Sequence, residues 1–161
     1  MTLVESRLDE LGLVLPEQMR LPPGVHLPFA WVRIRGNRAY ISGHGPLNPD
    51  GSLSGPFGRV GSEDSTEAGY EAARGAALSV LASLKRELGD LGRVSAWLMV
   101  HGLVNAASDF GDTTSVVNGF SDLILELYGP EVGTHARTAP GVVTLPLNHA
   151  VFVAAEVEVQ V

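Results

Sequence analysis

The strongest regularity in the chain is a helical repeat of apolar positions between residues 64 and 90. Small residues fill the middle of this segment, which suits a helix that packs closely against a sheet. Asp64 can cap its N-terminus, and Glu67 stands three residues further on, as in a capping box. We therefore predict one long amphipathic helix, whose apolar stripe consists of Tyr70, Ala73, Ala77, Leu81, Leu84 and Leu88.

The part of the chain before this helix predicts a short helix, a hairpin and a loop. Apolar residues recur at near-helical spacing in residues 1–18, which indicates an N-terminal helical extension ended by Pro16. The alternating segments AWVRI and AYIS flank a Gly-Asn turn at 36–37 and predict a β-hairpin. Residues 43–61 are rich in glycine and proline, so we expect a loop there, broken by one short strand near residues 57–60.

The part after the long helix predicts a strand, a second helix and two closing strands. The strand covers residues 93–104, and the helix covers residues 112–129 with Asp112 as its cap. The closing strands are VVTLP (142–146) and HAVFVAAEVEVQV (149–161).

This order of elements predicts an α+β fold in one domain over residues 1–161, with its core in residues 22–161. Two helices cover one face of a mixed sheet. The other face is then bare, and HAVFVAAEVEV indicates that it is apolar. We expect oligomerisation to bury that face.

Charge disfavours two classes of function. The net charge is −7, with 11 basic residues against 18 acidic ones, whereas nucleic-acid binders neutralise phosphates with clustered Lys and Arg. The densest basic group is Arg33, Arg35 and Arg38, and strand alternation puts the first two on one solvated face. The single lysine, Lys85, lies in a helical pattern at a solvated surface, which disfavours Schiff-base chemistry.

Composition also bears on the compartment. The chain has no cysteine, which excludes disulfides and thiolate chemistry and fits a reducing environment. No stretch is long and apolar enough to span a bilayer, and the acidic N-terminus lacks the features of a signal peptide. We therefore expect a cytoplasmic protein without a membrane partner.

Motifs for cofactors, metals and covalent catalysis are not found in the sequence. GHGPLNPDG is glycine-rich but lacks the strand and helix context of a nucleotide-binding loop. The five histidines show no pair at helical i, i+4 spacing, and no nucleophile elbow is recognisable. His44 and His135 stand out only because both lie in glycine-rich loops next to strands. We expect neither a metal nor a cofactor.

Arg137, in GTHARTAPG, has no acidic residue within five positions on either side. One interpretation is a surface arginine at a strand start, held by a carbonyl or a distant carboxylate. The other is a fixed fork for the carboxylate of a ligand, because a guanidinium offers paired N–H donors at carboxylate geometry. The small neighbours Thr138 and Ala139 leave room for a ligand and expose backbone N–H groups.

Five segments in the same order carry a resemblance to a known family: LPFAWVRIRGNRAYISGHGPL, DSTEAGYEAARGAALSVLASL, VNAASDF, VVNGFSDLILELYG and HARTAPGVVTLPLNHAVFVAAEVEV. From about residue 22 to its end, the chain resembles the Rid/YjgF family, the reactive-intermediate deaminases also called endoribonuclease L-PSP. It is most similar to a longer branch of that family with an extra N-terminal helix. The resemblance implies a chorismate-mutase-like fold and a homotrimer with a barrel-like core and sites between subunits.

The same resemblance implies roles for individual residues. Arg137 would bind the carboxylate of a small 2-imino or 2-amino acid, helped by backbone groups near Thr138 and Ala139. Ser42 and Asn118 match other positions that line the family's pocket. Without the resemblance, Ser42 is a polar residue at a strand end and Asn118 an amide on a helix surface, and both interpretations stay open.

The chain also departs from the family's deaminases. They have an aromatic hydroxyl at the position of Phe29 and a glutamate on the last strand, where an ungapped match puts Ala154; Phe152 replaces another common acidic residue. Glu156 lies on the same side of that strand, roughly 7 Å further along, so a register slip or a bulge is needed to bring it to the site. Pro140 removes one backbone donor beside the pocket.

Three functional hypotheses follow from these residues. The first is hydrolysis of 2-imino (or enamine) acids to 2-keto acids and ammonia, with Arg137 and Glu156 as the catalytic candidates. The second is a trimer that binds a small carboxylate for regulation and has lost catalysis. The third, an endoribonuclease, is disfavoured by the net charge and the single lysine.

Overall fold

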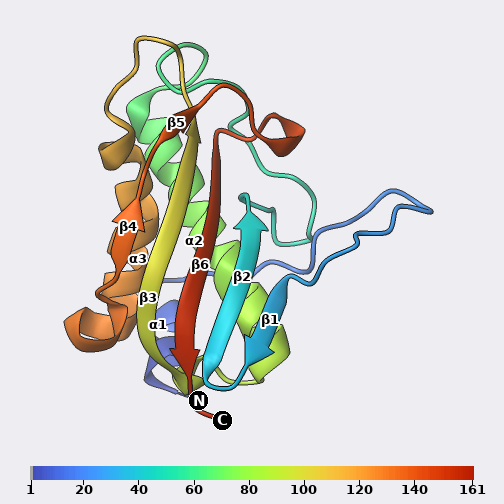
Figure 1. Ribbon diagram of the computed structural model, residues 1–161, viewed down its shortest axis with the longest axis vertical. Coiled ribbons are helices and arrows are strands. Elements are labelled where there is room, and N and C mark those ends of the chain that lie inside the picture. Colours follow the sequence, from blue (N-terminus) through green and yellow to red (C-terminus); the bar gives the residue numbers. More distant parts are fainter. Residues whose placement is uncertain (1) are drawn as a thin grey trace.

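The computed structural model of the protein describes residues 2–161 (Figure 1). The chain forms one mixed sheet and three α-helices, with two short 3-10 turns at Leu91–Arg93 and Pro146–Asn148. The elements in chain order are α1 (Leu3–Glu10), β1 (Val32–Arg35), β2 (Arg38–His44), α2 (Thr66–Leu88), β3 (Val94–Asn105), α3 (Thr113–Gly133), β4 (Ala136–Thr138), β5 (Gly141–Val142) and β6 (Val151–Val159).

The strands follow the order β1-β2-β6-β3-β4, and β5 also pairs with β3. Neighbours are antiparallel except at the β4 and β5 edge, where both short strands run parallel to β3. Helices α2 and α3 lie together behind the sheet and cover one of its faces (Figure 1). The predicted α+β architecture, with two helices on one face of a mixed sheet, is therefore confirmed.

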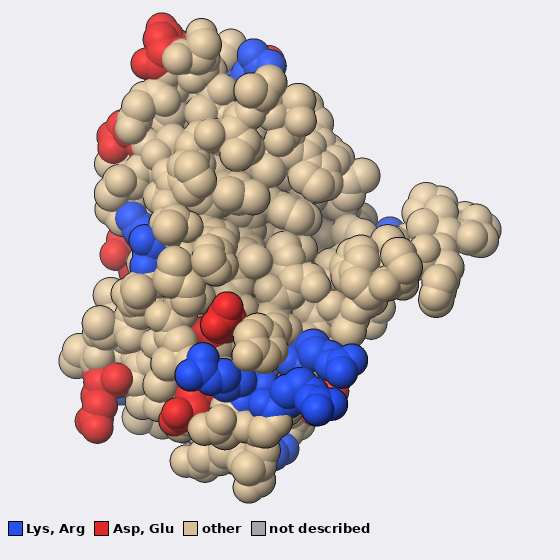
Figure 2. Space-filling model, viewed as in Figure 1, with Lys and Arg blue, Asp and Glu red and all other residues tan. Residues whose placement is uncertain are grey.

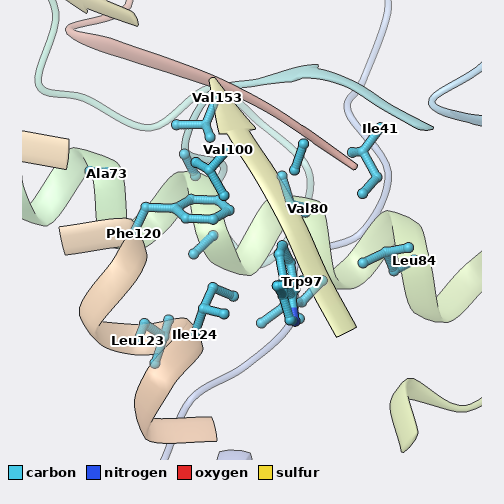
Figure 3. Packing of buried hydrophobic residues seen from close by; sticks show 14 of the residues in the cluster. Ile41, Ala73, Val80, Leu84, Trp97, Val100, Phe120, Leu123, Ile124 and Val153 are labelled. Atoms are coloured by element: carbon cyan, nitrogen blue, oxygen red, sulfur yellow. The ribbon is translucent and has the colours of Figure 1, made fainter. Parts of the chain in front are cut away.

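The core lies between the sheet and these two helices. Along β6 every second residue is buried, so that Val153, Ala155 and Val157 face the helices. Trp97 of β3 contacts Phe120 of α3 edge to face, with ring centroids 5.9 Å apart. Figure 3 shows side chains from β3, α2 and α3 meeting in this single layer. The sheet alternation and the helix stripe thus bury each other.

The predicted ends of the two long helices are partly corrected. Ser65, not Asp64, caps α2, because its Oγ accepts a hydrogen bond from the backbone N–H of Ala68 at 3.1 Å. Asp112 caps α3 as predicted. The third helix continues to Gly133 beyond a kink at Gly129, which has a positive φ of 76°.

The N-terminal helix is shorter than predicted. It ends at Glu10, because Gly12 adopts a positive φ of 66° and Leu13 donates a backbone hydrogen bond back to Leu8. This glycine cap, and not Pro16, stops the helix. Of the predicted helical extension 1–18, residue 1 lies outside the described part of the chain.

Two predicted strands are also wrong in detail. Of the segment 142–146, only Val142 belongs to a strand, β5, and the chain then turns at Pro146. Instead, Ala136–Thr138 forms β4, which the sequence pattern did not predict. Near residues 57–60 there are isolated bridges in place of a strand. The runs involved are too short for alternation to show.

One face of the sheet carries no helix, and Figure 2 shows it as a largely uncharged surface with basic and acidic side chains gathered at one end. Arg33 and Arg35 are both exposed on β1, as predicted from alternation. Residues 21–29, which we call the arm, extend away from the sheet (Figure 1). The arm contains exposed apolar side chains, among them Val25 and Phe29.

Helices α2 and α3 approach most closely at Gly119. A Cβ built on this glycine would clash with the carbonyl oxygen of Tyr70, which is backbone and has little freedom to move. We expect Gly119→Ala to lower the free energy of unfolding by about 1–3 kcal/mol, in the range of other overpacking substitutions. Chemical denaturation measures this change. Gly111→Ala is the matched control, because a Cβ there meets nothing within 4 Å; equal stability of the two variants would contradict the close helix contact.

Candidate functional site

Arg137 lies on β4 at the edge of the sheet, and its side chain turns toward α3. Pairing of Arg137 with Val100 gives it the same orientation as that core residue of β3. Its Nη1 donates hydrogen bonds to the side-chain oxygens of Asn118 at 2.9 Å and Ser121 at 3.0 Å. The structure thus brings together Arg137 and Asn118, two of the predicted site residues that are far apart in sequence.

The charge of Arg137 has no anionic partner at contact distance. Within residues 2–161, no carboxylate oxygen lies within 4.0 Å of its guanidinium. Partial burial lowers its pKa, which the more distant carboxylate of Asp122 raises, and an arginine remains protonated throughout. Asp122 itself accepts a hydrogen bond from the Tyr70 hydroxyl at 2.7 Å. Neutral acceptors therefore orient a positive charge that they do not neutralise.

His135 completes this polar cluster beside Arg137. Its Nδ1 lies 2.7 Å from the carbonyl of Gly133 and must carry the proton, so its Nε2 accepts from the Ser121 hydroxyl at 2.8 Å. Burial, and then the charge of Arg137, lower the pKa of His135. A neutral His135 fixes the Ser121 hydroxyl so that its free lone pairs face Arg137. The glycine-rich context of His135 was the only sequence signal for this role.

Thr138 lies on the other side of β4 from Arg137, whereas Ala139 packs against the core. Thr138 Oγ1 is 3.5 Å from Nδ1 of His101. The carbonyl of Pro140 accepts a hydrogen bond from the backbone N–H of Val104, so this proline joins β4 to β5 without breaking the edge. The role of backbone groups near Thr138 and Ala139 in holding a ligand stays a prediction.

Phe29 and Ser42 are in a different place. They line a cavity of about 850 Å³, which we call the arm cavity, between the arm, the end of β2 and the segment 146–152. Strands β6 and β3 separate β2 from β4. One chain therefore does not unite the predicted site: Arg137, Asn118, Thr138 and Ala139 form one part, and Phe29 and Ser42 form another.

A β-bulge shapes the second part. The register between β2 and β6 shifts between Ile41 and His44, so Ser42 and Gly43 leave the regular ladder. Ser42 Oγ donates a hydrogen bond to the carbonyl of Ala30 at 2.7 Å. Bulges often re-aim side chains next to binding sites, and this one turns the end of β2 toward the arm.

A chain of hydrogen bonds connects the bulge to α2. His44 Nδ1 lies against the Ser42 carbonyl and carries the proton, and its Nε2 accepts from the Ser83 hydroxyl at 2.8 Å. Arg86 donates to Ser83 at 3.0 Å and to the carbonyl of Pro16 at 3.3 Å. Burial lowers the pKa of His44 to about 4, so the ring is neutral near pH 7. The sequence does not indicate Ser83 or Arg86 as site residues, because both lie within the predicted long helix.

Glu156, the acidic residue predicted for the site, lies on β6. Glu156 pairs with Tyr40 and Met99 on the bare face, opposite to the face that Arg137 uses. Strand β3 has a register shift between Trp97 and Met99, yet this bulge leaves Glu156 on that face. The register does not bring Glu156 to Arg137 within one chain.

Phe152 is the residue of β6 that lies in the same cavity as Phe29 and Ser42. It lines the arm cavity, and a Cβ on Gly43 would clash with its ring. The aromatic ring therefore occupies the place beside Ser42 where the family's deaminases commonly have an acid. Ala154 pairs with His101 and contributes no carboxylate.

In residues 2–161, no three His, Cys, Asp or Glu side chains lie close enough to hold a metal ion. None of the helices described is long and apolar enough to cross a membrane.

His44 gives the site a testable pH dependence. Its pKa is about 4 in the folded protein and 6.5 without burial, so the unfolded chain takes up the proton first. Stability is therefore full above about pH 6.5 and declines toward pH 4. Over that interval we expect the wild type to lose about 3 kcal/mol more than His44→Gln.

Denaturant titrations at several pH values measure this difference. His26→Gln is the matched control, because His26 is exposed in the arm. Parallel stability curves for the wild type and His44→Gln would show that His44 is not the buried neutral group described here.

Comparison with known proteins agrees with this fold over almost its full length. The sequence profile of the family described as "YjgF/chorismate mutase-like, putative endoribonuclease" matches residues 5–159. Protein TCP17 of Trypanosoma cruzi is 37% identical over 155 residues, which cover 96% of this chain and 93% of that protein.

Solved structures show the same architecture. Atu1372 of Agrobacterium tumefaciens, described as of unknown function, has a TM-score of 0.86 at 32% identity and covers 99% of this chain and 93% of its own. A putative endoribonuclease of Shewanella oneidensis has a TM-score of 0.83 at 31% identity, with coverages of 97% and 99%. TdcF of E. coli, solved with bound serine, shares the fold alone, at 15% identity and a TM-score of 0.57, with coverages of 90% and 99%.

Proposed function

This chain belongs to the YjgF/chorismate mutase-like (Rid) family, and we propose that it binds a small carboxylate ligand through Arg137 and hydrolyses 2-imino acids to 2-keto acids and ammonia. The observation that carries the proposal is the oriented, unneutralised guanidinium of Arg137. Asn118 and Ser121 each accept one hydrogen bond from Nη1. Other N–H donors of the guanidinium therefore remain for a bidentate carboxylate. The serine bound to TdcF is a small amino acid and agrees with such a ligand.

A second copy of the chain would complete the site. Arg137 lies on the edge strand β4 and Ser42 on β2, with β3 and β6 between them, so a site that uses both needs two subunits. The bare face offers the surface for this assembly, with Tyr40 of β2 42% exposed on it. A closed trimer would bury this face three times and form three equivalent sites.

Arg137 and a bound water suffice for the proposed reaction. The guanidinium holds the carboxylate of the imino acid and fixes the imine carbon for attack. Water adds to that carbon and one of its protons moves to the imine nitrogen, which gives a carbinolamine. The remaining hydroxyl proton then moves to nitrogen as the C–N bond breaks, which releases the keto acid and ammonia. Positioning alone can supply several kcal/mol of barrier reduction, on the order of 7 kcal/mol in good cases. We place this chemistry in the cytoplasm, in keeping with the absence of cysteine.

A non-catalytic carboxylate-binding trimer is the second candidate. It is favoured by the missing acid–base groups: Phe29 has no hydroxyl, Phe152 has no carboxylate, and Glu156 faces away from Arg137. The family's endoribonuclease label receives less support. The net charge is −7, and the largest group of basic side chains visible in Figure 2 lies near one end of the sheet with acidic ones beside it.

The assembly can be tested by size-exclusion chromatography with light scattering. We expect a mass three times that of the 17.0 kDa chain, because the bare sheet face is too apolar to remain exposed. The mass should hold on dilution through the micromolar range. A monomeric mass would remove the basis for a site shared between subunits.

The reaction can be tested with an imino acid made in situ by an amino-acid oxidase. We expect the wild type to accelerate release of keto acid and ammonia, and Arg137→Ala to lose about tenfold or more of that rate, because a charge-assisted carboxylate contact is lost. Arg74→Ala, on the outer side of α2, is the matched control and should keep the wild-type rate.

The outcomes separate the two candidates. No acceleration by the wild type, together with calorimetric binding of a keto acid that Arg137→Ala abolishes, would select the non-catalytic trimer. Equal rates or equal binding in Arg137→Ala and Arg74→Ala would exclude Arg137 as the anchor.

A further inference from the structure

The arm cavity has the size of a small-molecule site. Its volume of about 850 Å³ falls within the roughly 300–1,000 Å³ typical of ligand pockets. Segments of the same chain wall it on several sides: the arm, the bulged end of β2, the C-terminal part of α2 and residues 146–152. A small carboxylate such as pyruvate would fill only a minor part of this space.

Aromatic rings form part of the cavity wall, among aliphatic side chains that include Leu21, Leu27 and Leu53. Phe29 and Trp31 contact each other edge to face at 5.5 Å, and Trp31 lies 5.0 Å from the His44 ring. On the opposite side His149 stacks on Phe152, with centroids 5.9 Å apart and planes at 21°. Such rings favour another flat apolar group, through burial and through edge-to-face contacts.

Two glycines, Gly43 at the end of β2 and Gly45 just after it, allow these rings to approach the backbone closely. A Cβ on Gly45 would come within 2.7 Å of the His149 ring, and a Cβ on Gly43 would clash with Phe152. The rings therefore lie directly against the backbone of β2, beside Ser42. This packing fixes Phe152 as part of the cavity wall.

The charged groups of the cavity wall are all cationic. Among residues 2–161 its charged side chains are Arg20 and Arg86, and no carboxylate lines it. Arg20 lies 3.7 Å from Asp50, whereas Arg86 has no carboxylate within 4.0 Å. Burial lowers the pKa of both His44 and His149, so both rings are neutral near pH 7. A cationic ligand finds no partner here, and an anionic one is tolerated.

His149 adds an unused polar group. It is 1% exposed, and its buried Nδ1 has no hydrogen-bond partner within residues 2–161. An unpaired buried polar atom costs about 1–3 kcal/mol. A ligand or a water in the cavity would relieve that cost if it reached this nitrogen.

We propose that the ligand of this protein carries a bulky apolar, preferentially aromatic, side group that occupies the arm cavity, with Phe152 as the residue that selects it. The inference rests on the proposed function, because the carboxylate of the same ligand is bound by Arg137 of a second copy. The substrate class is then a 3-aryl or similarly bulky 2-imino acid, and the product is the corresponding keto acid.

Calorimetric titration of the wild-type protein tests the proposal with four probes: phenylpyruvate, pyruvate, indole and 2-phenylethylamine. We expect phenylpyruvate to bind at least about tenfold more tightly than pyruvate, since full burial of an aromatic side chain is worth that factor or more. The cationic 2-phenylethylamine should bind more weakly than phenylpyruvate by a similar factor.

Two variants make the test specific to the cavity. Phe152→Glu puts a carboxylate into the cavity and should remove the preference for phenylpyruvate over pyruvate. Leu3→Ala truncates an exposed apolar side chain on α1, outside the cavity, and should leave the preference unchanged. Circular dichroism and light scattering confirm that both variants keep the fold and the assembly.

The results distinguish failure of this inference from failure of the proposed function. Pyruvate binding that depends on Arg137, with phenylpyruvate no tighter, would overturn the aromatic preference and leave the carboxylate anchor intact. Indole binding that Phe152→Glu abolishes, with neither keto acid bound, would support the aromatic cavity and overturn the anchor. A protein that binds none of the four probes would overturn the inference.

Discussion

Helices α2 and α3 cover one face of the sheet, and the alternation along β6 buries Val153, Ala155 and Val157 against them. The same alternation leaves the intervening residues, Phe152, Ala154 and Glu156, on the other face. A sheet of this size with one uncovered apolar face is not a stable end point in water. The proposed assembly with further copies of the chain would cover that face, and the proposed site shared between subunits depends on it.

The guanidinium of Arg137 is partly buried, and no carboxylate in contact with it neutralises its charge. Arg137 lies against the neutral oxygens of Asn118 and Ser121, and His135 is kept neutral beside them. A carboxylate near the guanidinium would have satisfied it within the chain and closed the site to a ligand. Neutral acceptors instead fix its orientation and leave its charge for an anion from outside. This arrangement supports binding in either candidate function, since both begin with capture of a carboxylate.

The sequence predicts what local patterns encode. The long helix, the hairpin and the Asp112 cap each depend on neighbouring residues, so spacing and turn chemistry were sufficient. Strand β4 was missed because its three residues are ordered by pairing with β3, a contact between distant segments. The arm cavity was missed for the same reason, and the resemblance suggested Phe29 and Ser42 without showing that they are far from Arg137. No periodicity could assign Ser83 or Arg86, whose roles arise only where α2 passes under the bulge of β2.

The replacement of acidic and hydroxyl groups by aromatic rings changes what the pocket can do to a substrate. With Phe29 and Phe152 in the wall, the arm cavity has no carboxylate or phenol to exchange a proton, and burial lowers the pKa of His44 and His149, which makes both rings weak bases. Any rate acceleration must then come from holding the imine and water in line and from excluding other water. Those effects increase with the tightness and rigidity of binding, so an aromatic pocket favours catalysis only for a ligand large enough to fill it. The proposed specificity for a bulky side group and the lack of a carboxylate in the cavity wall therefore both depend on Phe152.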